Sequence, residues 1–212
     1  WAFNFQYLHY ASACANVPLD MASSAQSKAK PAIIPADGMT VAGGWLVCIG
    51  LLGVVITSAL YAMSPPQTVL PSGTPDLLQA RALATGGAPT IRAAGLIGIV
   101  GDLLFACGAL VLHQRSRTVA AAIGWSLIAM CGVIFIIVDS MACFALVPAA
   151  ADAGAFAAIK LLFDALFLAG TIATGLGMIL LFATRSAGEE SLLASAGLLS
   201  GCACIAGTLA CL

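Results

Sequence analysis

Long apolar runs separated by short polar stretches dominate the chain. Five runs reach the roughly 20 residues that a helix needs to cross about 30 Å of hydrocarbon, and they lie at about 41–63, 93–113, 119–143, 154–182 and 191–212. None alternates apolar with polar residues as a strand of a membrane barrel does. Because a bilayer admits only helices or closed barrels, the pattern predicts an all-α integral membrane bundle of five transmembrane helices.

Two segments lie outside the five runs. Residues 1–40 contain three prolines and no run long enough to span, so we divide the chain into a non-spanning arm at 1–40 and a transmembrane domain at 41–212. The arm opens with Trp1–Tyr7, where aromatic residues alternate with small or polar ones, and we expect it to lie along a membrane interface or against a partner. Residues 64–92, which contain Pro65, Pro66, Pro71 and Pro75, are predicted to form a long outer loop.

Basic residues predict the orientation, because Lys and Arg favour cytoplasmic loops. The links after the second and fourth runs are basic, so the amino terminus is expected in the cytoplasm and an odd number of spans leaves the carboxyl terminus outside. The cytoplasmic set is Lys28, Lys30, Arg115, Arg117 and Arg185, against Arg81 and Arg92 outside. Trp45 and Trp125 then fall near the inner interface and Tyr61 near the outer one, where amphipathic rings favour the headgroups.

Composition excludes other classes of protein. The chain is 61% hydrophobic and only 8% charged, with a formal net charge of -1 and a mean hydropathy of +1.06. A soluble domain has about 25% charged residues, and a disordered chain has low hydrophobicity and high net charge. Nucleic-acid binding through a basic surface is also excluded, because the chain carries no excess of positive charge.

Four charged residues lie inside the predicted spans: Asp102, Asp139, Lys160 and Asp164. A charge at this depth costs at least about 2.5 kcal/mol on insertion scales, so each one is a candidate functional residue. In the orientation above, all four fall in the outer half of the membrane. Lys160 and Asp164 share a helix face at i, i+4, and three carboxylates against one ammonium leave a surplus of negative charge. Protonating one aspartate or binding a cation would relieve that surplus.

Three interpretations of this polar cluster stay open. In the first, Lys160 ties the second, third and fourth spans together and Asp139 lies at the interface. In the second, the cluster lines a proton or cation pathway. In the third, Asp102 and Asp139 on adjacent spans form the aspartate pair of an intramembrane protease, although Gly98–Asp102 departs from the Gly-x-Gly-Asp pattern of such enzymes.

Glycines recur at helix-packing intervals. Gly95, Gly98 and Gly101 are three residues apart on the second span, and Gly197 and Gly201 form a Gly-x-x-x-Gly motif on the fifth. Small residues at these spacings let helix backbones approach closely in lipid. The partner of the fifth span is either another helix of this chain or another subunit.

No motif predicts a cofactor or a metal site. The chain has eight cysteines but no Cys-x-x-Cys, and seven of them lie in apolar spans, where cysteine behaves as a small hydrophobe. Only His9 and His113 are present, neither in the middle of a span, so two histidines of this chain cannot hold a haem across the bundle. Nucleotide-binding, zinc-protease and serine-hydrolase motifs do not occur. Contact with a lipid or a pigment stays open.

Two short runs carry a family resemblance. Arg92–Leu104, which reads RAAGLIGIVGDLL, is similar to the opening of the second span in a bacterial multi-pass membrane family known only as a domain of unknown function. Phe163–Asp164 and Leu180–Ser186 resemble a later span of that family and its basic end. The resemblance covers roughly 41–212 and implies a helical bundle without an activity. The arm, Lys160 and the cysteine-rich fifth span depart from it.

From these features we expect a non-catalytic subunit or accessory protein of a larger complex in a bacterial cytoplasmic membrane. Its partners would be membrane lipids and other membrane subunits, reached through the arm and the fifth span. The alternative is a proton- or cation-coupled carrier or channel that uses the Asp/Lys cluster. An intramembrane enzyme is the third interpretation.

Overall fold

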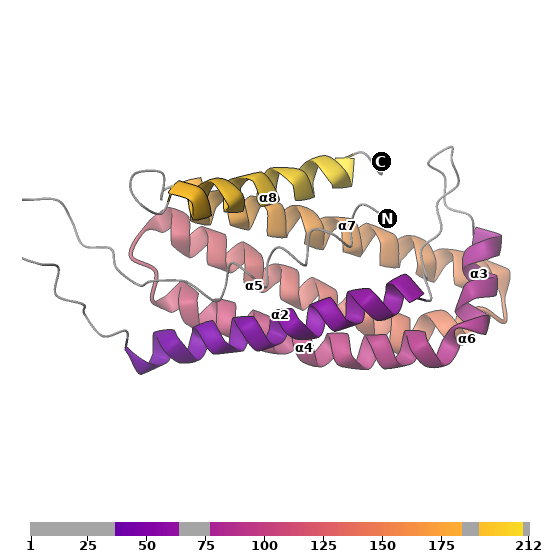
Figure 1. Cartoon of the computed structure of the whole chain (residues 1–212). Coiled ribbons are helices and arrows are strands. Elements are labelled where there is room, and N and C mark those ends of the chain that lie inside the picture. The colour runs from indigo at the N-terminus through magenta and orange to yellow at the C-terminus, as the bar shows by residue number, and fades with distance from the viewer. Residues whose placement is uncertain (1–36, 64–76, 184–190, 210–212) are drawn as a thin grey trace, which may run out of the picture.

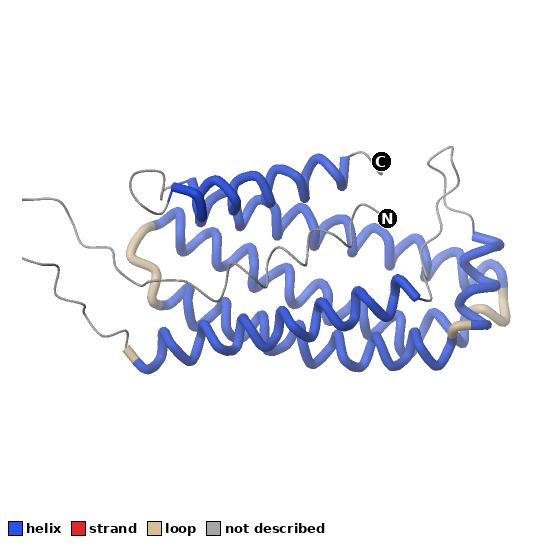
Figure 2. Tube along the Cα trace, viewed as in Figure 1, coloured by secondary structure: helices blue, strands red, loops and turns tan. Residues whose placement is uncertain are grey.

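The computed structural model describes residues 37–63, 77–183 and 191–209, and every regular element in these ranges is a helix (Figures 1 and 2). The helices are α2 Gly38–Met63, α3 Leu77–Gly86, α4 Ala88–Gln114, α5 Val119–Ser140, the π-helix η1 Met141–Leu146, α6 Val147–Ala149, α7 Ala153–Ala183 and α8 Ser191–Leu209.

Four of these helical segments are long and apolar enough to cross a membrane: Gly38–Tyr61, Ala88–Gln114, Val119–Ala149 and Ala153–Ala183. The chain is therefore an all-helical, multi-pass membrane protein. The described apolar part of α8 is shorter, Ala194–Thr208. Large apolar side chains such as Trp45, Val100 and Phe144 are more than half exposed on the outside of the bundle, where lipid would cover them.

The long helices pack in chain order, α2 on α4, α4 on α5, α5 on α7 and α7 on α8 (Figure 1). Short links explain this order, because helices joined by a few residues become antiparallel neighbours. Residues 115–118 join α4 to α5, and residues 150–152 join α6 to α7. Asp152 begins α7 by accepting a hydrogen bond from the Ala155 backbone N–H at 2.7 Å.

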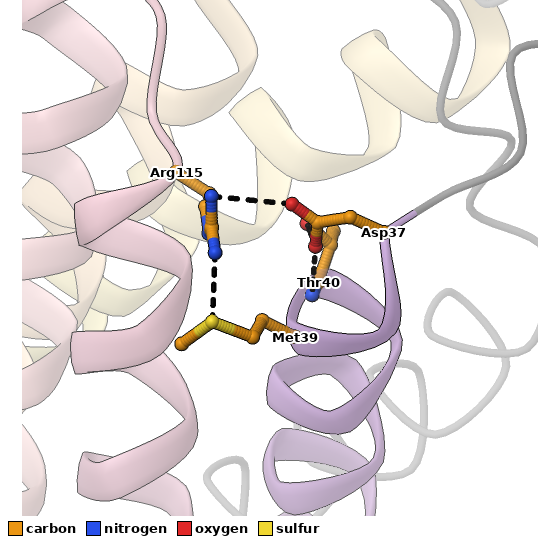
Figure 3. A network of polar contacts seen from close by, with 4 residues as sticks. All are labelled: Asp37, Met39, Thr40 and Arg115. Atoms are coloured by element: carbon orange, nitrogen blue, oxygen red, sulfur yellow. Dashed lines mark hydrogen bonds and ion pairs between the residues drawn. The ribbon is translucent and has the colours of Figure 1, made fainter.

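The start of α2 is held by a small polar network (Figure 3). Asp37 Oδ1 accepts hydrogen bonds from the backbone N–H of Thr40 at 2.8 Å and from its hydroxyl at 2.9 Å. Arg115, in the link between α4 and α5, forms an ion pair with Asp37 at 3.2 Å. Residues 38–40 of the predicted arm thus belong to α2, and residues 1–36 lie outside the described part of the chain.

The segment predicted as an outer loop differs from the structure in its second half. Residues 77–86 form α3, and α4 begins at Ala88, earlier than the predicted residue 93. Pro89 lies in the first turn of α4, where its missing N–H has no helical partner to lose. The prolines indicated a loop here, but Ala80 and Ala84 on α3 are almost completely buried.

The third span is also longer than predicted, because η1 and α6 continue α5 to Ala149. A proline inside an α-helix leaves the carbonyl four residues earlier without a partner and clashes with it. A π-helix pairs each carbonyl with the residue five positions on. The π-helix η1 ends two residues before Pro148, so the wider turn lies where regular α-helical bonding is interrupted.

Helix α3 lies across one end of the bundle, beside the link between α6 and α7 (Figure 1). We call this the α3 end. Its buried alanines belong to the main apolar core, which also contains Ile91, Leu146 and Phe156, and Tyr61 packs against that core. The α3 end is thus closed by packed apolar side chains.

Candidate functional site

The described part of the bundle buries three of the four charged residues predicted inside the spans. Asp102, Asp139 and Lys160 expose 2%, 5% and 2% of their surfaces, and the Asp164 side chain exposes 26%. The structure divides the four residues into two pairs, one between α4 and α5 and one within α7.

The first pair joins two carboxyl groups. Asp102 on α4 and Asp139 on α5 lie within hydrogen-bonding reach of each other. Tyr61, near the end of α2, donates a hydrogen bond from its hydroxyl to Asp139 Oδ1 at 2.8 Å. We call Asp102 and Asp139 the carboxyl pair; with Tyr61 they join three adjacent helices in the core.

Glycines on α4 make room for this pair. A Cβ at Gly98 would overlap the Asp139 carboxyl group, and one at Gly95 would meet the Asp139 backbone carbonyl. The carboxyl group therefore lies directly against the α4 backbone. Beside it, the buried Thr57 hydroxyl donates to the Ala94 carbonyl at 3.3 Å, so α2 and α4 are also joined by a polar contact at this level.

The chemistry of the carboxyl pair follows from its surroundings. Two carboxyl groups share a hydrogen bond only when one of them carries a proton, because two ionised groups repel each other. No lysine or arginine of the described residues forms an ion pair with Asp102 or Asp139. The site can hold one proton between the two carboxyl groups. The Tyr61 hydroxyl donates a hydrogen bond to Asp139, which stabilises a negative charge on that carboxyl group.

The second pair lies within one helix. The Lys160 ammonium donates to Asp164 Oδ1 at 2.6 Å, and it lies 5.8 Å from the centre of the Phe163 ring. The interpretation in which Lys160 ties three spans together, with Asp139 at the interface, differs from this arrangement. Lys160 bonds to its own helix because a partner one turn away is within easy reach, and Asp139 is buried in the core.

Asp164 is more exposed than Lys160, and it lies on the face of α7 that packs against α8. On α7, a Cβ at Gly175 would meet the Gly201 carbonyl of α8. Asp164 shares the α8-facing stripe with Gly175, since eleven residues correspond to about three turns.

The predicted packing glycines face neighbours within this chain. Gly101 approaches Gly53 on α2, with its Cβ position 3.0 Å from the Gly53 Cα. On α8, Gly197 lies against the Phe182 ring and Gly201 against Gly175 on α7. The glycine face of α8 is thus occupied by α7, which answers the question of its partner that the sequence left open.

Sequence reasoning missed Tyr61 as a site residue, because its position near the end of a span is typical of an interfacial aromatic residue. The position of Tyr61 along its span could have indicated this role, since it falls in the same half of the bundle as both aspartates. Cys131 was also missed; it is buried near Asp102, and it accepts a hydrogen bond from the Thr174 hydroxyl at 2.7 Å. Nothing in the spacing of these residues indicates those contacts.

Two further features limit what the site can bind. Within the described residues, no group of three or more His, Cys, Asp or Glu side chains could hold a metal ion. A groove on the outside of the bundle runs between α2 and α4, and its lining is apolar. The lining residues are Ile49, Leu52, Gly53, Ile56, Leu96, Ile97, Val100, Gly101 and Leu104. The groove therefore contains neither member of the carboxyl pair.

Comparison of the chain with known protein families, with curated proteins and with solved structures finds no match.

Proposed function

We propose that this protein moves protons through the membrane, alone or in exchange for a cation, by way of the carboxyl pair. The observation that carries the proposal is the contact between two buried carboxyl groups that have no basic partner among the described residues. Ionisable residues inside a membrane are costly, and they mark proton and ion pathways.

The two carboxyl groups suit reversible proton transfer. A pair can hold one proton between its members, release it, or take up a second one. Tyr61 donates to Asp139 Oδ1, so it stabilises Asp139 as the ionised member and favours the proton on Asp102. A proton arriving at Asp139 from the α3 end would compete with the Tyr61 hydrogen bond, and the pair returns to its one-proton state when Asp102, near the middle of α4, releases the proton it already holds.

Proton flux into liposomes tests this proposal. The purified protein is reconstituted with a pH-sensitive dye inside and a potassium diffusion potential as the driving force. Asp139→Asn and Asp102→Asn each keep the side-chain shape but cannot release a proton. Each should reduce flux by about 100-fold, the lower end of what a positioned proton donor or acceptor contributes.

The matched control is Asp152→Asn. Asp152 is exposed and caps α7, and asparagine caps a helix about as well as aspartate, so flux should stay at the wild-type level. Wild-type flux in both core variants, or no flux through the wild-type protein, would refute the proposal.

An accessory subunit is the second candidate, favoured by the apolar groove between α2 and α4. Gly53 and Gly101 lie in this groove, flanked by exposed branched side chains such as Leu52 and Val100. A helix of another membrane subunit could place side chains there. Purification from native membranes in mild detergent tests this function, and a monodisperse protein without companions argues against it.

The intramembrane protease is the weaker use of the same pair. Hydrolysis requires a water molecule and a substrate carbonyl between the two carboxyl groups. Here Asp139 already accepts a hydrogen bond from Tyr61, and its carboxyl group lies against the α4 backbone at Gly98. Proton transfer needs no such space, so it is the function that the geometry favours.

We further propose the topology on which the proposed pathway depends. In it, α8 is a fifth span, the link between α4 and α5 faces the cytoplasm, and the α3 end faces outward. The basic residues Arg115 and Arg117 in that link support this orientation, and the resemblance of Arg92–Leu104 to a bacterial family supports a bacterial cytoplasmic membrane.

A further inference from the structure

We propose that α3 is a hinged plug that keeps water away from the carboxyl pair at the α3 end, with Arg81 as its latch. The inference rests on the proposed function for its purpose, but the plug itself is a structural claim with a separate test.

Helix α3 packs on the main apolar core of the bundle. Ala80 and Ala84 expose 1% and 0% of their surfaces, and they pack in one core with Ile91 of α4 and Leu146 of η1. Gly98, against which the Asp139 carboxyl lies, is seven residues below Ile91, or about 11 Å along the helix axis. Tyr61 packs against the same core and reaches Asp139. The covering layer is therefore thin.

The side chain of Arg81 holds α3 in place. The Arg81 guanidinium donates from Nε to the Ala150 carbonyl at 2.6 Å and from Nη2 to the Ala151 carbonyl at 3.0 Å. These carbonyls follow α6, and the last carbonyls of a helix lack helical partners and carry partial negative charge. One cationic side chain thus ties α3 to the link between α6 and α7.

The joint between α3 and α4 would let α3 move. Only Gly87 separates α3 from α4. A Cβ at Gly86 would have no atom within 4 Å, so this side of the joint is open, and bending would break the helical hydrogen bonds that link Gly87 to Leu83 and Ile91. Pro89 fixes the first turn of α4, so bending is confined to the two glycines. Once its latch is broken, α3 can swing from the end of the bundle while α4 keeps its place.

Cys143 is a natural reporter of this movement. It exposes 5% of its surface, and it lies between the plug and the carboxyl pair, where its Cβ is close to Gly95. A charged, membrane-impermeant methanethiosulfonate reagent modifies a thiol only where water reaches it. The experiment uses the full chain with the other cysteines replaced by alanine, reconstituted in liposomes.

Arg81→Ala should speed the labelling of Cys143 by about tenfold or more, because it removes both charge-assisted hydrogen bonds that hold α3 closed. Arg81→Lys keeps the charge but not the paired donors, so its labelling rate should lie between those of the wild type and Arg81→Ala. Arg92→Ala is the matched control, because Arg92 is a nearby exposed arginine on α4, and its labelling rate should equal the wild-type rate.

A wedge provides a second variant that leaves the latch intact. Ala84→Leu adds a side chain where Ala84 has no exposed surface, so it should lift α3 and speed labelling as Arg81→Ala does. Leu78→Ala, at a position that is 80% exposed, is its control. Each variant must keep the wild-type helical circular dichroism and elution volume.

Equal labelling rates in wild type, Arg81→Ala and Ala84→Leu would overturn the plug, as would rapid labelling of the wild type. Labelling that rises as expected while Asp139→Asn leaves flux unchanged would keep the plug and remove the proton function. Loss of flux in Asp139→Asn without any effect of Arg81→Ala on labelling would do the reverse.

Discussion

At the scale of single residues, the site depends on where one glycine lies. Gly98 brings the Asp139 carboxyl group against the α4 backbone, so that Asp139 meets both Tyr61 and Asp102. Any side chain at residue 98 would push this carboxyl group away from its partners. The spacing of Gly95, Gly98 and Gly101 predicts helix packing, but Gly98 also makes room for a functional side chain.

Gly98→Ala should therefore lower stability by about 1–3 kcal/mol, the usual cost of overpacking a core, although alanine favours helix more than glycine does. Thermal unfolding in detergent micelles measures this effect. Gly44→Ala is the matched control, because a Cβ at Gly44 on α2 has no atom within 4 Å, and it should be neutral or stabilising. Equal stability of the two variants would contradict the role of Gly98.

At the scale of elements, helix ends and irregular turns place the side chains. The π-helix η1 starts two residues after Asp139 and ends two residues before Pro148. At the opposite end, Asp37 caps α2 and reaches Arg115 (Figure 3). The hydrogen bonds from the Thr40 backbone and hydroxyl, with a smaller contribution from Arg115, hold the pKa of Asp37 below its usual value of 3.8.

This lowered pKa predicts how the end of α2 responds to pH. The ionised cap stabilises the folded state above pH 3.8, and the stabilisation is lost as the pH falls through the lower pKa of the folded state. Asp37→Asn keeps a capping side chain without the charge. The wild type should thus be more stable than this variant at pH 6, and the difference should vanish in strong acid.

Thermal unfolding of both proteins across this pH range checks the prediction. Because Asp37 and Arg115 are both partly exposed, the difference at pH 6 should also shrink in high salt. A difference that persists unchanged in strong acid would contradict this account of the cap.

At the scale of the whole molecule, the long helices pack side by side in chain order, and the carboxyl pair lies where three of them meet. The carboxyl pair and Tyr61 join α2, α4 and α5, whereas Lys160 and Asp164 remain on α7. Helix α8 packs its glycines on α7 and takes no part in the carboxyl pair. Whether α8 crosses the membrane therefore decides the topology without altering the site.

The proposed topology predicts that residue 212 and the link at 115–118 face opposite sides of the membrane. Short epitope tags inserted after Ser116 and after Leu212 are probed with antibody in intact vesicles of known orientation. With five spans, only one tag is accessible before the vesicles are permeabilised. Access to both tags from the same side would show that α8 does not cross.

The sequence by itself determined that the chain is a bundle of apolar helices, because the length of an apolar run and the cost of charge in lipid depend only on local composition. It also identified the charged residues inside the spans and the glycines along them. Residues 77–92 escaped prediction, since the prolines of 64–92 indicated a loop and the carbonyl partners of Arg81 at 150 and 151 are distant in sequence.

Only the tertiary structure decided how these residues pair. The partner of a buried side chain depends on the rotation of each helix about its axis and on the shift between neighbouring helices. These are set by contacts such as Gly101 on Gly53 and Gly95 on Cys143. They bring Asp102 to Asp139, place Tyr61 on Asp139, and leave Lys160 with Asp164. Composition places the charges in the membrane, but packing makes two of them a pair that can share a proton.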